Sequence, residues 1–181
     1  MKIITINEPK IIMSNPMSKH NYFGWPTAAK LQNGKIAVAA SGFRIQHVCP
    51  FGKAVMVLSD DGGETYTLPA PIIDTPLDDR DSGILPFGEN GVMVTSFNNT
   101  IKFQRDTAMR AGTRNYRLSY LDMLSEEDEK RYLGSTFRVS FDGGITFVSF
   151  IKALSPLLTV RSSSETVILY GLEEPFPPMT L

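Results

Sequence analysis

The sequence predicts an all-β protein built from two antiparallel four-stranded units, and two observations support this prediction. First, the pattern Ser-x-Asp-x-Gly-x-Thr-aromatic occurs twice, at residues 59–66 and 140–147. Second, each copy follows a short apolar run typical of a strand, at residues 54–58 and 136–139. Asp-Gly-Gly after such a run is typical of a hairpin, because glycine accepts the positive φ of a tight turn. Two copies of one pattern indicate a repeat architecture.

The first unit contains four expected strands in up-and-down order. Residues 27–32 and 35–40 are joined by Asn33-Gly34, which is the strongest short hairpin signal. A polar loop then leads to the strand at residues 54–58. The first Asp-Gly-Gly turn follows, and we expect the fourth strand at residues 65–69.

The second unit repeats this order. Residues 83–87 lead through a Glu-Asn-Gly turn to the strand at residues 92–97. A long connection precedes the strand at residues 136–139. After the second Asp-Gly-Gly turn, we expect the last strand at residues 146–151.

The connection between residues 98 and 134 contains one segment with helix signals. Residues 124–133 carry acidic side chains early and basic side chains late, which complements the helix dipole. Ser125 is in a suitable position for an N-cap, and Gly134 for a stop. We therefore expect one short helix in an otherwise irregular excursion.

Composition limits the functions that the protein can have. The 181 residues suffice for one domain with a sizeable core. Eighteen Lys and Arg against 19 Asp and Glu give a formal charge of −1, which argues against binding to nucleic acid or an anionic membrane. Cys49 is the only cysteine, which excludes an internal disulfide and a thiolate metal cluster. With neither a signal-peptide segment nor a run of membrane-spanning length, we expect a cytoplasmic protein, and we expect no cofactor and no metal.

Two four-stranded units with the same turn in the same place are typical of two blades of a β-propeller. The chain resembles the Asp-box (BNR-repeat) sialidase superfamily, whose members are six-bladed propellers. The two boxes carry the resemblance, together with Trp25-Pro26-Thr27 and Asn33-Gly34-Lys35, and it covers roughly residues 20–155. It implies a partial propeller with blade one at about 20–72, blade two at about 80–153, and the start of a third.

The box residues are expected to be structural. One interpretation makes Asp61 and Asp142 catalytic carboxylates, and the other makes them acceptors that lock the turn. We favour the second, because strand order places the box turns at the end of each unit opposite the second-to-third loop. The resemblance implies the same. The eight structural box residues are Ser59, Asp61, Gly63, Thr65, Ser140, Asp142, Gly144 and Thr146.

The candidate site is expected at the opposite end, where residues 20–26, 41–53, 75–82 and 98–134 meet. Carboxyl pairs can cleave glycosidic bonds, and arginines bind carboxylates through paired hydrogen bonds. The candidate catalytic residues are Arg44, His47, Asp79 and Asp81, and the candidate substrate-binding residues are Trp25, Lys53, Arg80 and Arg105.

Each candidate also has a plain structural interpretation. The aspartates of residues 78–81 can be solvated turn acids, and Arg44 and His47 can be ordinary loop residues. Trp25 can be core packing or a platform on which a sugar stacks. His20 is expected to be structural, and the arginines of the long connection are expected to be solvated surface.

The sequence departs from the sialidase pattern in two places. Such sialidases open the first blade with an aromatic-Arg-Ile-Pro motif, whose arginine grips the sialic acid carboxylate, but Gly24 stands at that position here. The acid/base aspartate of the second-to-third loop is also missing, because residues 41–53 contain no Asp or Glu. We therefore expect a related glycosidase acting on a carbohydrate, or a lyase with His47 as base and Arg44 neutralising a uronate. The alternative is a non-catalytic carbohydrate-binding propeller.

The last 26 residues do not continue the pattern. No turn is evident at residues 157–166, where the repeat requires one. Codons permitted for residues 158–174 can encode a strand, an Asn-Gly turn and another strand in a shifted frame. We hypothesise that a frameshift near Ser155 replaced the native continuation and left an inactive fragment, with an aberrant tail at about 156–181. Such a fragment would self-associate through exposed blade edges. A natural half-propeller that dimerises is the alternative.

Overall fold

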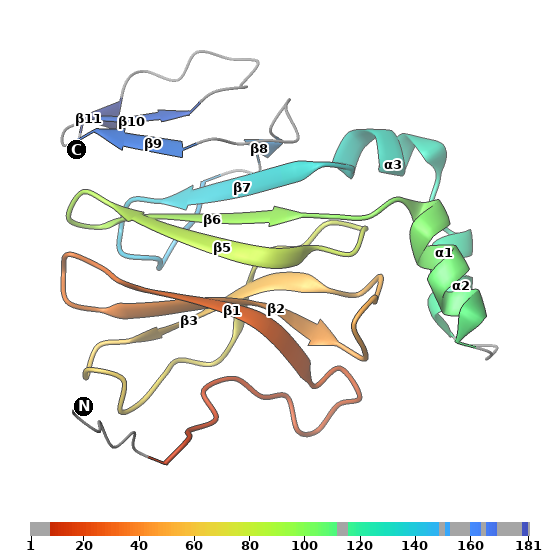
Figure 1. Ribbon diagram of the computed structural model, residues 1–181, viewed down its shortest axis with the longest axis horizontal. Helices are drawn as coiled ribbons and strands as arrows, with labels where there is room; N and C mark the ends of the chain where they lie inside the picture. Colours follow the sequence, from red (N-terminus) through yellow and green to blue (C-terminus); the bar gives the residue numbers. More distant parts are fainter. Residues whose placement is uncertain are drawn as a thin grey trace, which may run out of the picture.

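The computed structural model describes residues 8–111, 116–148, 151–152, 160–163, 166–169 and 179–180 (Figure 1). This part of the chain is mostly β, with two four-stranded antiparallel sheets, a small third sheet and three short helices. The two larger sheets lie side by side, and within the described residues they do not close into a ring. The all-β prediction is therefore confirmed.

The first sheet has the up-and-down order β1-β2-β3-β4. Its strands are β1 (Tyr22–Lys30), β2 (Ile36–Arg44), β3 (Lys53–Ser59) and β4 (Ala70–Ile73). β2 lies between two neighbouring strands and carries small apolar residues. It is buried along most of its length. The β1–β2 hairpin turns at Gly34, whose φ of +88° requires glycine.

The second sheet repeats this order as β5-β6-β7-β8. Its strands are β5 (Arg80–Phe87), β6 (Gly91–Phe97), β7 (Ser135–Ser140) and β8 (Ile151–Lys152). The repeat of two antiparallel units that the sequence indicates is thus present in the structure.

The fourth strand of each sheet begins later than expected. We predicted it at residues 65–69 and 146–151, but the structure has β4 from Ala70 and β8 from Ile151. The reason lies in the box turn. The amide of Thr65 donates to the Asp61 carboxylate and is therefore not available to pair with β3. Two residues later, the Thr67 amide donates to the Leu58 carbonyl, but the Leu58 amide donates to the Thr67 hydroxyl rather than to a backbone carbonyl, so a regular ladder is not yet formed.

The chain beyond residue 156 contains strands that the sequence analysis did not expect. β9 (Val160–Ser163) and β10 (Thr166–Leu169) pair antiparallel, and β11 (Met179–Thr180) pairs with β10. The expectation of no turn at residues 157–166 falls on residues 157–159 and 164–165, which lie outside the described residues. β-Branched residues in both strands favour extended structure even where turn residues such as Gly or Asn are missing.

The long connection forms three helices where we expected one. They are α1 (Ile101–Arg110), α2 (Tyr116–Asp122) and α3 (Glu126–Tyr132). The prediction of α3 is confirmed, since Ser125 caps it in a capping box with Asp128. Within the described part of the chain, no helix has the length and apolarity needed to cross a membrane.

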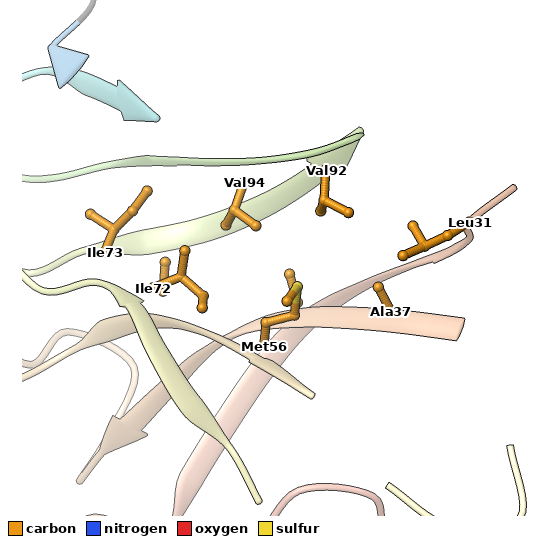
Figure 2. Packing of buried hydrophobic residues seen from close by; sticks show 9 residues of the cluster. Leu31, Ala37, Met56, Ile72, Ile73, Val92 and Val94 are labelled. Atoms are coloured by element: carbon orange, nitrogen blue, oxygen red, sulfur yellow. The ribbon is translucent and has the colours of Figure 1, made fainter. Parts of the chain in front are cut away.

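A hydrophobic core holds the two larger sheets together (Figure 2). Alternate residues of β6 face the first sheet, where they meet side chains from β2, β3 and β4. A further small cluster of Met93, Phe137 and Val139 covers the other face of the second sheet. The buried residues of the main cluster are Leu31, Ala37, Ala39, Ala54, Met56, Ile72, Ile73, Val92 and Val94.

Polar contacts also join the two sheets. Arg138 of β7 donates to the carbonyl of Ile72 in β4 at 3.0 Å. At the box end, Asn33 Nδ2 donates to Asn90 Oδ1 at 3.0 Å, and the amide of Gly143 donates to the Asn90 carbonyl at 2.8 Å. The turns of both sheets are therefore tied together, which fixes how their opposite ends face each other.

The strand register shows which residues lie at each end of the two larger sheets. Ile36 pairs with Ser59 at the box end, and Gly42 pairs with Lys53 at the other end. The second sheet has the same polarity, since the box residue Ser140 pairs with Val92. The box turns thus lie away from Arg44, as the strand order predicts, and the three helices lie at the end opposite the boxes (Figure 1).

Candidate functional site

Backbone strain is concentrated at the end of the sheets opposite the boxes. Among the described residues, the non-glycine residues with positive φ are Trp25, Phe43 and Asp81, at 52°, 51° and 50°. Shifts in strand register accompany Trp25 and Asp81. Such conformations cost roughly 1–3 kcal/mol each and occur most often at binding and catalytic sites. This end is therefore the first place to look for function.

A buried ion pair organises this end. Arg44 at the end of β2 and Asp78 in the link between the sheets are both fully buried and form a salt bridge. Arg44 also donates to the carbonyls of His47, at 2.7 Å, and Asp79, at 3.0 Å. Burial raises the pKa of Asp78, while the charges of its arginine neighbours and the Cys49 amide oppose that shift. The pair fixes the β2–β3 loop to the link.

Trp25, His47 and Arg80 gather beside this pair, and we call them the Trp25–His47–Arg80 cluster. Arg80 Nη2 lies 2.9 Å from His47 Nε2, and its guanidinium lies 5.5 Å from the Trp25 ring centroid. The His47 and Trp25 rings meet edge to face at 4.8 Å. Because arginine only donates, Nε2 of His47 accepts this bond and Nδ1 carries the ring proton. Unlike the buried pair, His47 is exposed and can contact a ligand.

The buried pair and Arg80 together carry more positive than negative charge. Two arginines face the single carboxylate of Asp78, whose Oδ1 pairs with Arg44 and whose Oδ2 accepts from the Cys49 amide. Arg80 Nη1 lies 3.7 Å from Asp78 Oδ2, which is too long for a hydrogen bond. Arg80 therefore keeps donor capacity beside an exposed histidine and an aromatic ring.

Asp79 is buried in a separate network. Its carboxylate accepts from the amide and the hydroxyl of Thr75, at 2.6 and 2.9 Å, and lies 3.5 Å from Asn98 Nδ2. Asn98 in turn binds the Tyr132 carbonyl and the Gly134 amide. Burial raises the pKa of Asp79 to about 7. This side chain joins the link between the sheets to the helical excursion, and it is not placed to contact a ligand.

The remaining predicted site residues lie outside the cluster. Asp81 is exposed, and its backbone amide donates to Ser41 Oγ at 2.7 Å. Lys53 forms a salt bridge with Asp74, and Arg105 on α1 forms one with Asp122 at the end of α2. The structure therefore brings together Trp25, Arg44, His47 and Arg80, and Asp79 meets them only through its backbone carbonyl, which accepts from Arg44. Lys53 and Arg105 lie in other ion pairs.

Both box turns have the arrangement that the structural interpretation requires. The hydroxyl of Ser59 donates to Asp61 at 2.8 Å and accepts from the Gly63 amide at 2.9 Å. Thr65 donates to Asp61 through both its amide and its hydroxyl. These hydrogen bonds hold the pKa of Asp61 well below its usual range. The second box repeats every contact through Ser140, Asp142, Gly144 and Thr146, and Gly63 and Gly144 both have positive φ.

Sequence reasoning missed two parts of this end. Asp78 was not singled out from its acidic neighbours, because only the fold shows which of them meets Arg44. His20, Phe51 and Tyr116 also meet here, with Phe51 and Tyr116 stacked at 5.3 Å between ring centroids. No sequence signal joins these three residues, because helix α2 carries Tyr116 back across 65 residues of chain.

Comparisons with known proteins leave the family open. No family model matches the chain, and no curated protein matches it. Among solved structures, it is similar to a protein of unknown function from Dyadobacter fermentans DSM 18053, with 20% sequence identity and a TM-score of 0.48. The match covers 77% of this chain and 38% of the other. The chain thus spans well under half the length of that neighbour.

Proposed function

We propose that the two larger sheets are blades of an Asp-box β-propeller of the sialidase-like class, and that the Trp25–His47–Arg80 cluster binds an acidic carbohydrate. Two features support the propeller. Each sheet has the same strand order, and each carries the same box turn at the same end. A ring of such sheets gathers the ends opposite the boxes around one mouth, where the cluster would lie.

The observation that carries the binding proposal is the position of Arg80 between an aromatic ring and an exposed histidine. A tryptophan offers a flat apolar surface for the C–H face of a sugar ring, together with one N–H donor. A guanidinium binds a carboxylate through charge-assisted hydrogen bonds, and Arg80 has donors to spare. Stacking beside a fixed cation is the combination that an acidic sugar requires.

Binding fits the described residues better than two-carboxylate hydrolysis does. Glycosidases place two carboxyl groups on either side of the scissile bond. Asp78 and Asp79 are fully buried in the contacts described above, so Asp81 is the exposed acid of this run.

A second candidate function is eliminative cleavage of a uronate glycoside. The observation that favours it is the exposed His47 imidazole beside Arg80. In such a reaction, Arg80 turns to the uronate carboxylate and releases the Nε2 lone pair of His47, which removes the proton at C5, next to that carboxylate. The electron pair of the C–H bond forms the C4–C5 double bond, the C4–O glycosidic bond breaks, and the leaving oxygen takes a proton from water. Arg80 takes the role that the sequence analysis gave to Arg44, because Arg44 is fully buried with its donors bound to Asp78 and two carbonyls, whereas Arg80 is 7% exposed and lies beside the exposed His47.

The test is isothermal titration calorimetry of the chain against galacturonate, trigalacturonate, N-acetylneuraminate, sialyllactose and a neutral trisaccharide. We expect binding of acidic but not neutral sugars, and a loss of about tenfold or more in affinity for Arg80→Gln. Arg105→Gln removes an equal charge outside the cluster and should bind as the wild type does. Equal binding of neutral sugars, or an Arg80→Gln variant with unchanged affinity, would contradict the proposal. Ultraviolet absorbance of an unsaturated product from trigalacturonate, lost in His47→Gln, would support elimination.

A further inference from the structure

An exposed aromatic surface lies at the same end of the sheets as the cluster and has no part in the function proposed so far. Tyr116 at the start of helix α2 is 42% exposed, and its ring stacks on Phe51 of the β2–β3 loop. The Lys19 ammonium lies over the Tyr116 ring, 5.3 Å from its centroid. The Tyr116 hydroxyl lies 3.2 Å from His20 Nε2, which fixes the edge of the ring. We call Lys19, Phe51 and Tyr116 the Tyr116 surface.

The chain connects this surface to the cluster through the buried Arg44–Asp78 pair. Phe51 precedes Gly52, which packs so closely on the buried pair that an added Cβ would lie 2.2 Å from Arg44 Nη1. His20 Nδ1 lies 2.9 Å from the carbonyl of Phe43, the residue before Arg44. Since Arg44 also donates to the His47 carbonyl, its guanidinium contacts both the loop residue that follows Phe51 and the residue that carries the exposed imidazole.

Packing alone does not account for Tyr116. The helix has a second tyrosine, Tyr120, whose ring lies 4.8 Å from Phe51 and whose hydroxyl donates to the Pro76 carbonyl at 2.8 Å. Tyr120 is partly buried and fastens α2 to the link between the sheets. Tyr116 is more exposed, and it holds a large ring and a lysine at the surface.

We propose that the Tyr116 surface is a second subsite, which binds the next sugar ring of an acidic oligosaccharide held by the Trp25–His47–Arg80 cluster. The sugar ring stacks on Tyr116, with Phe51 supporting the aromatic ring from behind. Lys19 moves off the ring, as an exposed flexible side chain can, and pairs with a carboxylate of the ligand. This inference rests on the proposed function, because the first sugar ring must occupy the cluster.

The test compares ligands of one and of three sugar rings. We would measure the affinities of galacturonate, trigalacturonate, N-acetylneuraminate and sialyllactose for the wild type, Tyr116→Ala, Tyr116→Phe and Lys19→Gln. Tyr116→Ala should weaken binding of the trisaccharides about tenfold and leave the monosaccharides within about twofold. Tyr116→Phe keeps the stacking ring and should bind trisaccharides nearly as the wild type does. Lys19→Gln should weaken trigalacturonate binding more than sialyllactose binding, because sialyllactose has its single carboxylate in the cluster.

The outcomes distinguish a failure of the second subsite from a failure of the proposed function. Trisaccharide affinity unchanged in both Tyr116→Ala and Lys19→Gln overturns the subsite and leaves the cluster intact. An equal loss for monosaccharides and trisaccharides also overturns it, because that result indicates a structural role for Tyr116. A wild-type chain that binds none of the four acidic ligands overturns the proposed function and the subsite together.

Discussion

Replacement of Asp79 by Asn should change how the stability of the protein depends on pH. The Asp79 carboxyl is fully buried, and its hydrogen-bond donors are the neutral groups of Thr75 and Asn98. Burial is the largest effect on this group, and it raises the pKa of Asp79 from 3.8 to about 7. Asn has nearly the same shape and carries no charge at any pH, so it isolates the effect of titration.

The direction follows from proton binding. Between about pH 4 and pH 7, the folded state holds a proton on Asp79 that the unfolded state has released. The free energy of unfolding therefore falls as pH rises through this range. The two pKa values differ by about 3, and each unit is worth 1.36 kcal/mol, so the loss is on the order of 4 kcal/mol at most. Asp61 and Asp142 do not interfere, because their lowered pKa values place their contribution below about pH 4.

The assay is urea unfolding at several pH values between about 4 and 8, followed by circular dichroism. The wild type should lose stability with rising pH relative to Asp79→Asn, and the two curves should run parallel above about pH 8. Asp81→Asn is the matched control, because it removes an exposed carboxyl two residues away and should follow the wild type. Parallel wild-type and Asp79→Asn curves across the whole range would refute the reasoning.

Much of the fold could be predicted because its signals are local. Asn33-Gly34 and the Asp-Gly-Gly turns fix where hairpins occur, since these positions require positive φ. The capping residues around Ser125 likewise located α3 correctly. Helix α1 also has local signals, since the Thr100 hydroxyl accepts from the Phe103 amide as an N-cap and Arg110 lies in its last turn, but the sequence analysis did not recognise them. Neither α1 nor α2 has an acidic residue in its first turn. Both helices make contacts with residues distant in sequence: the Tyr120 hydroxyl donates to the Pro76 carbonyl, and the Ile101 amide donates to the Glu129 carboxylate.

The candidate site could be predicted only in part, because burial decides the role of each charged residue. Topology correctly brought residues 41–53 and 75–82 to one end of the sheets. The sequence could not show that Arg44 is buried in a salt bridge with Asp78, while Arg80 keeps free donors. Nor could it show that Trp25 adopts a left-handed conformation, which places its ring between two arginines and His47.

Two further predictions concern the residues that hold the sheets and the site in shape. Asp61→Ala removes the acceptor for the amide and hydroxyl of Thr65, so it should lower the melting temperature and leave acidic-sugar affinity unchanged. Equal melting temperatures for this variant and the wild type would contradict the structural role of the box. Asp78→Asn leaves the Arg44 charge buried without its counterion, so urea unfolding should show a loss of about 3–5 kcal/mol. Replacing both partners, as Arg44→Met with Asp78→Leu, should restore much of that stability, because no buried charge remains. The double variant should nevertheless bind acidic sugars more weakly than the wild type, because Arg44 no longer holds the carbonyl of His47 and Asp78 no longer draws Arg80 toward the cluster. A stable double variant with wild-type affinity would show that the ion pair contributes to folding alone and does not position the cluster.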